Sequence, residues 1–341
     1  MRAFAIVTAV ILASASASAQ TRITIGIVPT VPAASTYLAV DKGYFHEAGI
    51  EAKIETVDSS SKIIPFLAQN QVQVAQGGLA IGYFNAVADG LPLILALEGG
   101  SSPLYHNVLV RADLKDKIKS VADLKGKSVA LTAPGAITNY EFGKVLASAG
   151  LTLKDIEPKY VSFPQMAAAF ANKGIDAGLE VAPFTDEITR RGIAVRWIDP
   201  DDYIKPTPMS TVGYMVNTDW AKQNPDLAHR VFTALAKGGR DYCQAYHHGP
   251  NRGEVEDILI KHKVMTDRDL LDKMDWQART PDGKFNVASL MDIQDFFIAD
   301  GTFTRKLPPE KLVDLSYSEQ AAKALGPFAV TNKASTLKGC R

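Results

Sequence analysis

The chain has 341 residues, 46% of them hydrophobic, so it is long enough for two globular domains with real cores, and nothing in its composition indicates disorder. Its 37 Lys and Arg residues balance 37 Asp and Glu residues without a long basic run, which argues against a nucleic-acid or anionic-membrane surface. Any charge selectivity must therefore be local.

The first residues predict export. An apolar run from Phe4 to Leu12 leads into ASASASAQ, where Ala17 and Ala19 fit a small-x-small cleavage pattern. We therefore expect residues 1–19 to be a cleaved signal peptide. No cysteine follows the cleavage site, and no later apolar run reaches the roughly 18 residues that a membrane helix needs. The mature protein is expected to be free in the periplasm of a Gram-negative-type cell.

The first element of the mature chain is a short β-branched strand, Ile23 to Val28, which stops at two prolines and leads into a helix opening with Ser35, Thr36 and Tyr37. The N–H groups at a helix start lack intrahelical partners, and the helix dipole favours an anion or acceptor there. Ligand contact and simple helix capping are both compatible with these hydroxyls.

Strands and helices then alternate, which is typical of an α/β protein with largely parallel sheets. The strand EAKIETV is followed by a serine-rich helix start, DSSSKIIPFLAQN, and VQVAQGGLAIGYF then predicts a strand, a Gly77-Gly78 turn and a helix. We expect Gly78 to allow close approach of the backbone to a ligand.

The same pattern restarts in the second half of the chain. A strand from Ser128 to Thr132 is followed by a proline turn and a helix carrying Thr138 and Asn139, and IDAGLEVAPF later echoes VQVAQGGLAIGYF. The parallel order predicts two similar lobes with a cleft between them, because open α/β sheets bind ligands at the carboxyl ends of their strands. Met209 to Asn217 is expected to cross back to the first lobe.

The sequence also resembles a known family. The segments AVDKGYFHEAGIEAKI, DLKGKSVAL, NKGIDAGLEVAPF and VDLSYSEQAAKALG resemble periplasmic solute-binding proteins of the NMT1-like group, which includes nitrate, sulfonate, taurine and thiamine-precursor binders. The resemblance runs from about Thr21 to Gly326. Two departures, QNQVQVA in the first lobe and the missing lipidated cysteine, leave the ligand open.

This resemblance implies a two-lobed, type II periplasmic binding protein fold, with a largely parallel, mixed sheet flanked by helices in each lobe. The expected division is a first lobe of residues 20–111 and 208–328, a second lobe of 112–207, and a tail of 329–341. The resemblance further implies ligand capture by hinge closure and delivery to an ABC permease at the inner membrane, driven by a cytoplasmic ATPase. We expect a monomer without a cofactor.

The predicted ligand is a small organic anion, a sulfonate or an aliphatic or aromatic carboxylate, held by helix N-termini. The alternatives are a thiamine-precursor pyrimidine or similar heterocycle, with Glu180 as its partner, and an exported ligand sensor. Candidate ligand contacts come from both lobes and the crossings: Ser35, Thr36, Tyr37, Gly78, Leu79, Tyr105, Thr138, Asn139, Glu180 and Tyr214.

Catalytic and metal motifs are missing from the sequence. It contains no phosphate loop, no nucleophile elbow and no H-E-x-x-H spacing, and the adjacent His247 and His248 would point in different directions on a helix. We therefore expect a binding protein rather than an enzyme, and no metal site.

The two cysteines, Cys243 and Cys340, lie in an exported chain, where a disulfide could persist and tie the tail to a helix. Two separate thiols are the alternative, because spacing alone does not give the Cα separation that a bridge requires.

Overall fold

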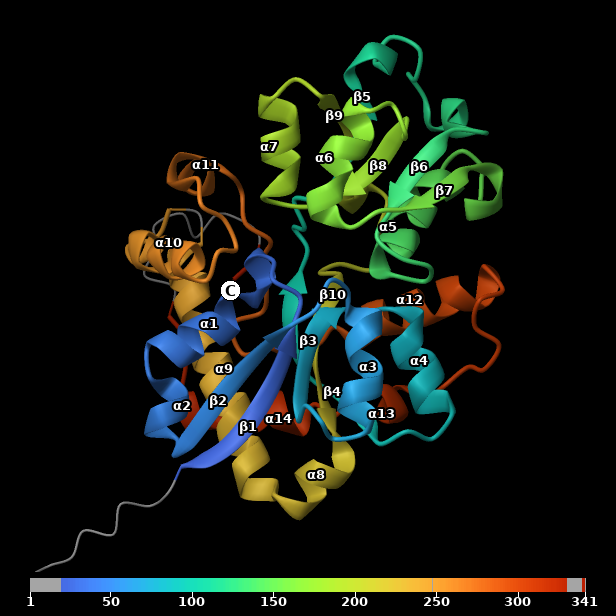
Figure 1. Cartoon of the computed structure of the whole chain (residues 1–341). Helices are drawn as coiled ribbons and strands as arrows, with labels where there is room; N and C mark the ends of the chain where they lie inside the picture. The colour runs from blue at the N-terminus through green and yellow to red at the C-terminus, as the bar shows by residue number, and fades with distance from the viewer. Residues whose placement is uncertain (1–19, 247, 330–338, 341) are drawn as a thin grey trace, which may run out of the picture.

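The computed structural model describes residues 20–246, 248–329 and 339–340; the expected signal peptide lies outside them. Two five-stranded sheets form two lobes, and two crossing segments connect them. Figure 1 draws the first lobe in its lower half and the second lobe in its upper half. Each sheet is mixed and flanked by helices, so the predicted two-lobed α/β fold is confirmed. Among the described residues, no helix is both long and apolar enough to span a bilayer.

The first sheet has the order β2-β1-β3-β10-β4. The strands β1 to β3 are parallel because helical crossovers connect them. The returning strand β10 runs antiparallel to both of its neighbours. Its strands are β1 (Thr21–Ile27), β2 (Ile50–Thr56), β3 (Val74–Gly78), β4 (Leu93–Ser101) and β10 (Ser210–Asn217).

The second sheet has the order β7-β6-β8-β5-β9 and repeats the arrangement of the first. Three parallel strands again adjoin one antiparallel strand, here β5, beside an edge strand. Its strands are β5 (Asn107–Arg111), β6 (Ser128–Leu131), β7 (Glu157–Tyr160), β8 (Ala177–Glu180) and β9 (Ala194–Ile198). The restart of the sequence pattern thus corresponds to a second sheet of the same order.

One predicted boundary differs from the structure. The sequence division placed residues up to 111 in the first lobe, but β5 pairs with β8 and β9 of the second sheet. The sequence of a short apolar strand does not indicate which sheet the strand joins, because its pairing depends on tertiary neighbours such as β8. The first crossing therefore spans the residues between Ser101 and Asn107.

Helices of the second lobe are few, whereas the C-terminal part of the chain adds many helices to the first lobe (Figure 1). The second lobe has α5 (Ile137–Ala147), α6 (Phe163–Ala171) and α7 (Phe184–Arg190). The first lobe begins with a short 3-10 turn, η1 (Val31–Ala33), and then has α1 (Ala34–Asp41), α2 (Tyr44–Glu47), α3 (Ser60–Ala68) and α4 (Ile81–Ala88). After β10 follow α8 (Thr218–Gln223), α9 (Pro225–Ala245), α10 (Arg252–Lys261), α11 (Arg268–Lys273), α12 (Val287–Ala299), α13 (Pro309–Leu312) and α14 (Ser316–Leu325).

The long helix α9 anchors the first lobe. Its apolar positions, spaced for one helix face, are buried against α1. Gly238 allows the two helices to approach closely, because a Cβ there would lie 2.3 Å from the carbonyl oxygen of Ser35. At the end of α9 the sulfur of Cys243 is bonded to that of Cys340, with the two Cα atoms 5.1 Å apart, so the tail is tied to this helix.

Candidate ligand cleft

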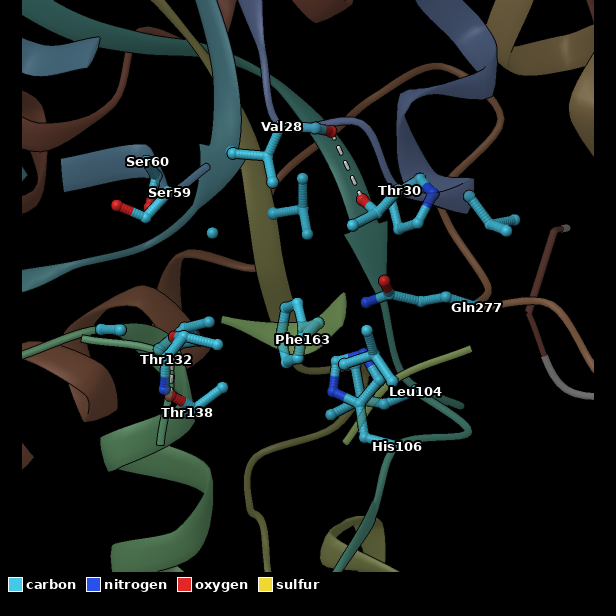
Figure 2. Close-up of a pocket in the computed structure, with 18 of the residues that line it drawn as sticks. Val28, Thr30, Ser59, Ser60, Leu104, His106, Thr132, Thr138, Phe163 and Gln277 are labelled. Carbon is cyan, nitrogen blue, oxygen red and sulfur yellow. Dashed lines mark hydrogen bonds between the residues drawn. The ribbon is translucent and has the colours of Figure 1, made fainter. Parts of the chain in front are cut away.

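A cavity of about 80 Å³ lies between the two lobes. Figure 2 shows residues from the strand ends and helix starts of both lobes around it. Parallel strands place their carboxyl ends, and the helix N-termini that follow them, at one edge of each sheet. The cavity lies where these two edges face each other.

The first-lobe wall comes from the ends of β1 and β3 and the start of α3. Val28 and Thr30 follow β1, and the Thr30 hydroxyl donates to the Val28 carbonyl oxygen at 3.5 Å. Ser59 and Ser60 open α3 beside Gly77, where a Cβ would lie 2.6 Å from the Ser60 Cβ. The bare backbone of β3 therefore lets the serine-rich helix start reach the cavity.

The second-lobe wall comes from the end of β6 and the start of α5. Thr132 and Thr138 both line the cavity, with 3.1 Å between their hydroxyl oxygens, and the Thr132 N–H donates to the Thr138 hydroxyl at 3.3 Å. Ile137 also lines the cavity and lies against Gly78 of the first lobe, and the Phe163 ring adds an apolar surface from the start of α6. This wall mixes hydroxyl donors with apolar area.

The third wall lies at the crossings. Leu104 and His106 come from the first crossing, and Gln277 comes from the far C-terminal part of the chain. His106 is buried and its Nδ1 lies 2.9 Å from the Glu141 Oε2 on α5. Burial lowers the pKa of His106, but the charge of Glu141 and the hydrogen bond to it prevail and raise the pKa above its ordinary value.

Glu180 is a second buried carboxyl group near the cleft. It is fully buried at the end of β8, next to Val181 and Ala182, which line the cavity. Burial raises the pKa of Glu180 well above its usual range, although the Val181 N–H donates to its Oε1 at 3.1 Å. Its Oε2 has no hydrogen-bond partner among the described residues. The side chain is therefore in its neutral form over a wider pH range than an exposed glutamate.

The two lobes contact each other beside the cavity. The Ile81 N–H of the first lobe donates to the Gly135 carbonyl oxygen of the second at 2.7 Å. On α5, the Tyr140 hydroxyl donates to the Asp292 Oδ2 of α12 at 2.6 Å, and the Lys144 ammonium lies 3.0 Å from the same oxygen. These contacts join the two lobes beside the cavity.

Two of the ten predicted ligand contacts, Gly78 and Thr138, line the cavity. Ser35, Thr36 and Tyr37 do not, because the chain already turns helical at Val31, and these residues face the interior of the first lobe. Thr30, Val31 and Pro32 line the cavity instead of these three residues.

The inward-facing residues of α1 have partners of their own. The Ser35 hydroxyl accepts a hydrogen bond from Arg279, and the Thr36 hydroxyl lies 2.9 Å from the hydroxyl of Tyr214. The Tyr37 ring stacks on His262, with centroids 4.2 Å apart. The predicted role of Tyr214 as a cleft wall is therefore replaced by a role in the core.

The other predicted contacts also lie outside the lining. Leu79 is buried in the core of the first lobe, and Tyr105 packs beside that core with a positive φ of 53°. The Asn139 amide can donate to the Ala133 carbonyl oxygen at 2.9 Å and accept from the Gly135 N–H at 3.2 Å, so it supports the turn before α5. The cavity lining also excludes Glu180 itself.

Several lining residues were missed by sequence reasoning: Thr30, Ser59, Ser60, Gln76, His106, Phe163 and Gln277. The serine-rich start of α3 was a signal for Ser59 and Ser60, and the polar Gln76 inside an apolar strand was a signal for a third position. No local signal marks Gln277, because it reaches the cavity only through packing of the C-terminal segment. Among the described residues, no group of three or more His, Cys, Asp or Glu side chains is placed to hold a metal ion.

Comparisons with known proteins agree with this architecture. A putative thiamine biosynthesis protein of Haemophilus influenzae is 33% identical over 132 residues, which cover 36% of this chain and only 38% of that protein. The alkanesulfonate-binding protein SsuA of Xanthomonas axonopodis pv. citri, solved with MOPS, has a TM-score of 0.71 at 18% identity, covering 88% of this chain and 100% of that one.

Two further solved structures share the fold. The periplasmic nitrate-binding protein NrtA of Synechocystis PCC 6803 has a TM-score of 0.72 at 14% identity, covering 94% of this chain and 92% of that one. The desulfurization enzyme DSZB has a TM-score of 0.59 at 15% identity, covering 90% and 100%. The fold thus occurs in both binding proteins and an enzyme. The model of the family described as NMT1/THI5 like matches residues 32–246, and the chain belongs to this family.

Proposed function

We propose that this protein is the periplasmic solute-binding component of an ABC importer. It captures a small organic solute when its two lobes close and delivers it to a membrane permease that a cytoplasmic ATPase drives. The observation that carries the proposal is the interlobe cavity, which is lined by helix starts from both lobes. Binding proteins for alkanesulfonate and nitrate with the same fold support a solute-binding role.

The preferred ligand is a carboxylate or sulfonate with a small apolar body. The starts of α3 and α5 and the residues around η1 bring backbone N–H groups and hydroxyls to one cavity, and helix dipoles favour a negative group there. Apolar side chains such as Val212 and Phe163 make up much of the remaining lining, which suits an organic body better than a hydrated inorganic ion.

A heterocycle such as a pyrimidine is the second candidate. The side-chain oxygens of Gln76 and Gln277 have no hydrogen-bond partner among the described residues, so both are free to accept from ring or amino N–H groups. The Phe163 ring lies across the same cavity and offers a face for stacking (Figure 2).

Binding rather than turnover is part of the proposal. Recovery of the unchanged solute after prolonged incubation is the expected result, and appearance of a product would identify an enzyme. Association with a permease, rather than with a membrane receptor, separates an importer component from a ligand sensor.

A thermal-shift panel of sulfonates, aliphatic and aromatic carboxylates, nitrate and pyrimidines tests the ligand class. A ligand at 100 times its dissociation constant adds about 2.7 kcal/mol to the free energy of unfolding, which is easily measured. If only sugars or cations shift the transition, both ligand proposals are wrong.

Thr138→Val tests the cavity itself. Loss of one hydrogen bond of about 0.5 to 1.5 kcal/mol should weaken binding of the selected probe about 2- to 12-fold. Thr233→Val is a matched control, because that hydroxyl donates to the His229 carbonyl oxygen on α9, away from the cavity. If the two variants change the affinity equally, Thr138 does not contact the ligand.

A further inference from the structure

His106 is the polar lining residue that lies on the crossing between the two lobes. It lies on the first crossing, directly before β5, and its Nδ1 is engaged by Glu141 at 2.9 Å. The other ring nitrogen, Nε2, has no partner among the described residues, and the residue belongs to the cavity lining. Figure 2 shows the imidazole at the crossing side of the cavity, near Leu104.

The pairing with Glu141 determines what Nε2 can do. When Nδ1 donates its proton to the carboxylate, Nε2 is an acceptor in the neutral ring and a donor in the protonated ring. None of the lining residues is Lys or Arg. A protonated His106 is therefore the one positive side chain that this lining can present to a ligand.

The surroundings of His106 favour the positive form. Glu141 faces it from α5, and Asp199 and Asp201 face it from the second crossing; all three raise its pKa by their charge or, for Glu141, also by a hydrogen bond. Glu180 lies on the neighbouring strand, where it pairs with Asn107, and burial raises the pKa of its carboxyl well above the usual range. Asp58 also lines the cavity, but its exposed carboxylate is paired with Lys62 at 2.7 Å.

We propose that His106, oriented by Glu141, binds the anionic group of the solute through its protonated Nε2–H, so that solute affinity depends on the protonation of this one imidazole. The inference rests on the proposed function and deepens it by naming the residue that supplies the positive charge. His106 belongs to the crossing that connects the lobes, so the charge sits where both lobes can enclose the bound anion.

The pH dependence has a defined sign. An anion that requires the protonated ring binds with constant affinity below the pKa of His106, and its affinity falls up to about ten-fold per pH unit above it, because one proton is linked to binding. By the same linkage, bound anion raises the pKa of His106. An uncharged ligand shows neither effect.

The test measures binding of ethanesulfonate, benzoate and the uncharged 4-amino-2-methylpyrimidine by calorimetry from pH 6 to 9, together with an NMR titration of the His106 ring. We expect at least one anion to bind with the falling affinity described above and to raise the NMR pKa of His106. His106→Gln should abolish the pH slope and weaken anion binding at pH 6. Glu141→Gln should lower the NMR pKa of His106 and shift the fall in affinity to lower pH.

Two variants serve as controls. His262→Gln removes a histidine–carboxylate pair with Asp41 outside the cavity, where the Nε2 to Oδ1 distance is 3.1 Å, and should keep the slope. Glu180→Gln removes a buried carboxyl beside the cavity whose pKa is raised by burial, and it should also keep the slope. Loss of the slope in Glu180→Gln would assign it to Glu180 and overturn the inference.

Three other outcomes would also overturn it. These are a His106 ring that is neutral at pH 6, anion binding that is independent of pH, and a protein that binds the pyrimidine but neither anion. In each of them the solute-binding function itself survives. Absence of binding by all three probes at every pH would instead count against the proposed function as well.

Discussion

Gly78 shows how closely the two lobes approach one another at a single residue. A Cβ at this position would lie 2.7 Å from the Cγ2 of Ile137, which belongs to the opposite lobe. Gly135 repeats the situation in reverse, because a Cβ there would lie 2.0 Å from the Cγ2 of Ile81. Gly78 is thus required by the contact between the lobes, whereas Gly135, with a positive φ of 64°, is also required by the turn in its own lobe.

Gly78→Ala should therefore weaken ligand binding while each lobe stays folded. Overpacking costs about 1 to 3 kcal/mol, and this cost applies only to the closed state, so binding of the selected probe should weaken about 5- to 150-fold. Isothermal titration measures the affinity, and circular dichroism checks the fold. Gly82→Ala on α4 is the control, since a Cβ there meets nothing within 4 Å. Unchanged binding in Gly78→Ala would contradict the closed contact.

Glu98 is a buried carboxyl whose titration should appear in the stability of the protein. Its Oε2 accepts hydrogen bonds from the Thr280 N–H at 2.6 Å and hydroxyl at 2.7 Å, but burial dominates and raises its pKa from 4.5 to about 7. Between these values the folded protein holds a proton that the unfolded chain releases. The stabilisation from Glu98 is thus complete below pH 4.5 and is lost as the pH rises to 7.

The free energy of unfolding should therefore fall between pH 5 and 7 by at most roughly 3 kcal/mol from this group. Glu98→Gln should make the decline shallower, because the amide does not titrate. Urea unfolding at several pH values measures both slopes. Identical slopes for parent and variant would show that Glu98 does not carry this dependence.

At the scale of elements, α5 joins the ligand site to the lobe contact. Its first turn lines the cavity, and its later residues Tyr140 and Lys144 bond to Asp292 on α12. Gly143 of α5 lies against Phe296 of α12: a Cβ at residue 143 would be 2.3 Å from the Phe296 ring. Helix α5 therefore links ligand contacts at the cavity to the contact between the second lobe and α12 of the first lobe.

Asp292→Ala should favour the open arrangement. The bond from the Tyr140 hydroxyl to a charged carboxylate is worth about 1.5 to 3 kcal/mol, whereas the partly exposed Lys144 pair adds little. Small-angle scattering should show a larger radius of gyration without ligand, and affinity for the selected probe should fall. Asp295→Ala on the same helix removes only an exposed pair with Lys306 and should change neither quantity.

The link between α9 and the C-terminal tail is the second prediction at this scale. Cys243 and Cys340 are 97 residues apart, and removing such a cross-link, as in the double alanine variant, should lower the free energy of unfolding by about 2 to 5 kcal/mol. In the folded parent, both thiols should resist alkylation until reduction. Rapid labelling of unreduced protein would show two free cysteines instead.

At the scale of the whole molecule, two sheets of the same strand order meet across two paired crossings. The Ser102 N–H donates to the Met209 carbonyl oxygen at 2.9 Å, and the Met209 N–H donates to the Ser102 hydroxyl at 2.7 Å, so the crossings are bonded where they run together. A bonded pair of strands is suited to act as one hinge when the lobes move.

Export is the prediction for the whole chain. Cleavage before Gln20 would leave every described strand intact, because β1 begins at Thr21. The intact mass of periplasmic protein should correspond to residues 20–341. Retention of Met1 or fractionation with membranes would contradict the predicted signal peptide.

Much of this architecture could be predicted from the sequence. Alternating periodicity indicated the α/β class, and the repeated strand–turn–helix order indicated two lobes. A glycine at a strand end and a recurring helix start predicted Gly78 and Thr138, and both residues line the cavity. These features depend on short stretches of chain, where side-chain spacing and backbone freedom act locally.

The tertiary structure alone decided the rest. The 3-10 turn at Val31 moved the helix start and turned Ser35 into the core, and pairing with β8 assigned β5 to the second lobe. The cavity combines Thr30, His106 and Gln277 from distant parts of the chain. Such combinations arise from packing between segments, and packing energies depend on neighbours that local sequence patterns do not specify.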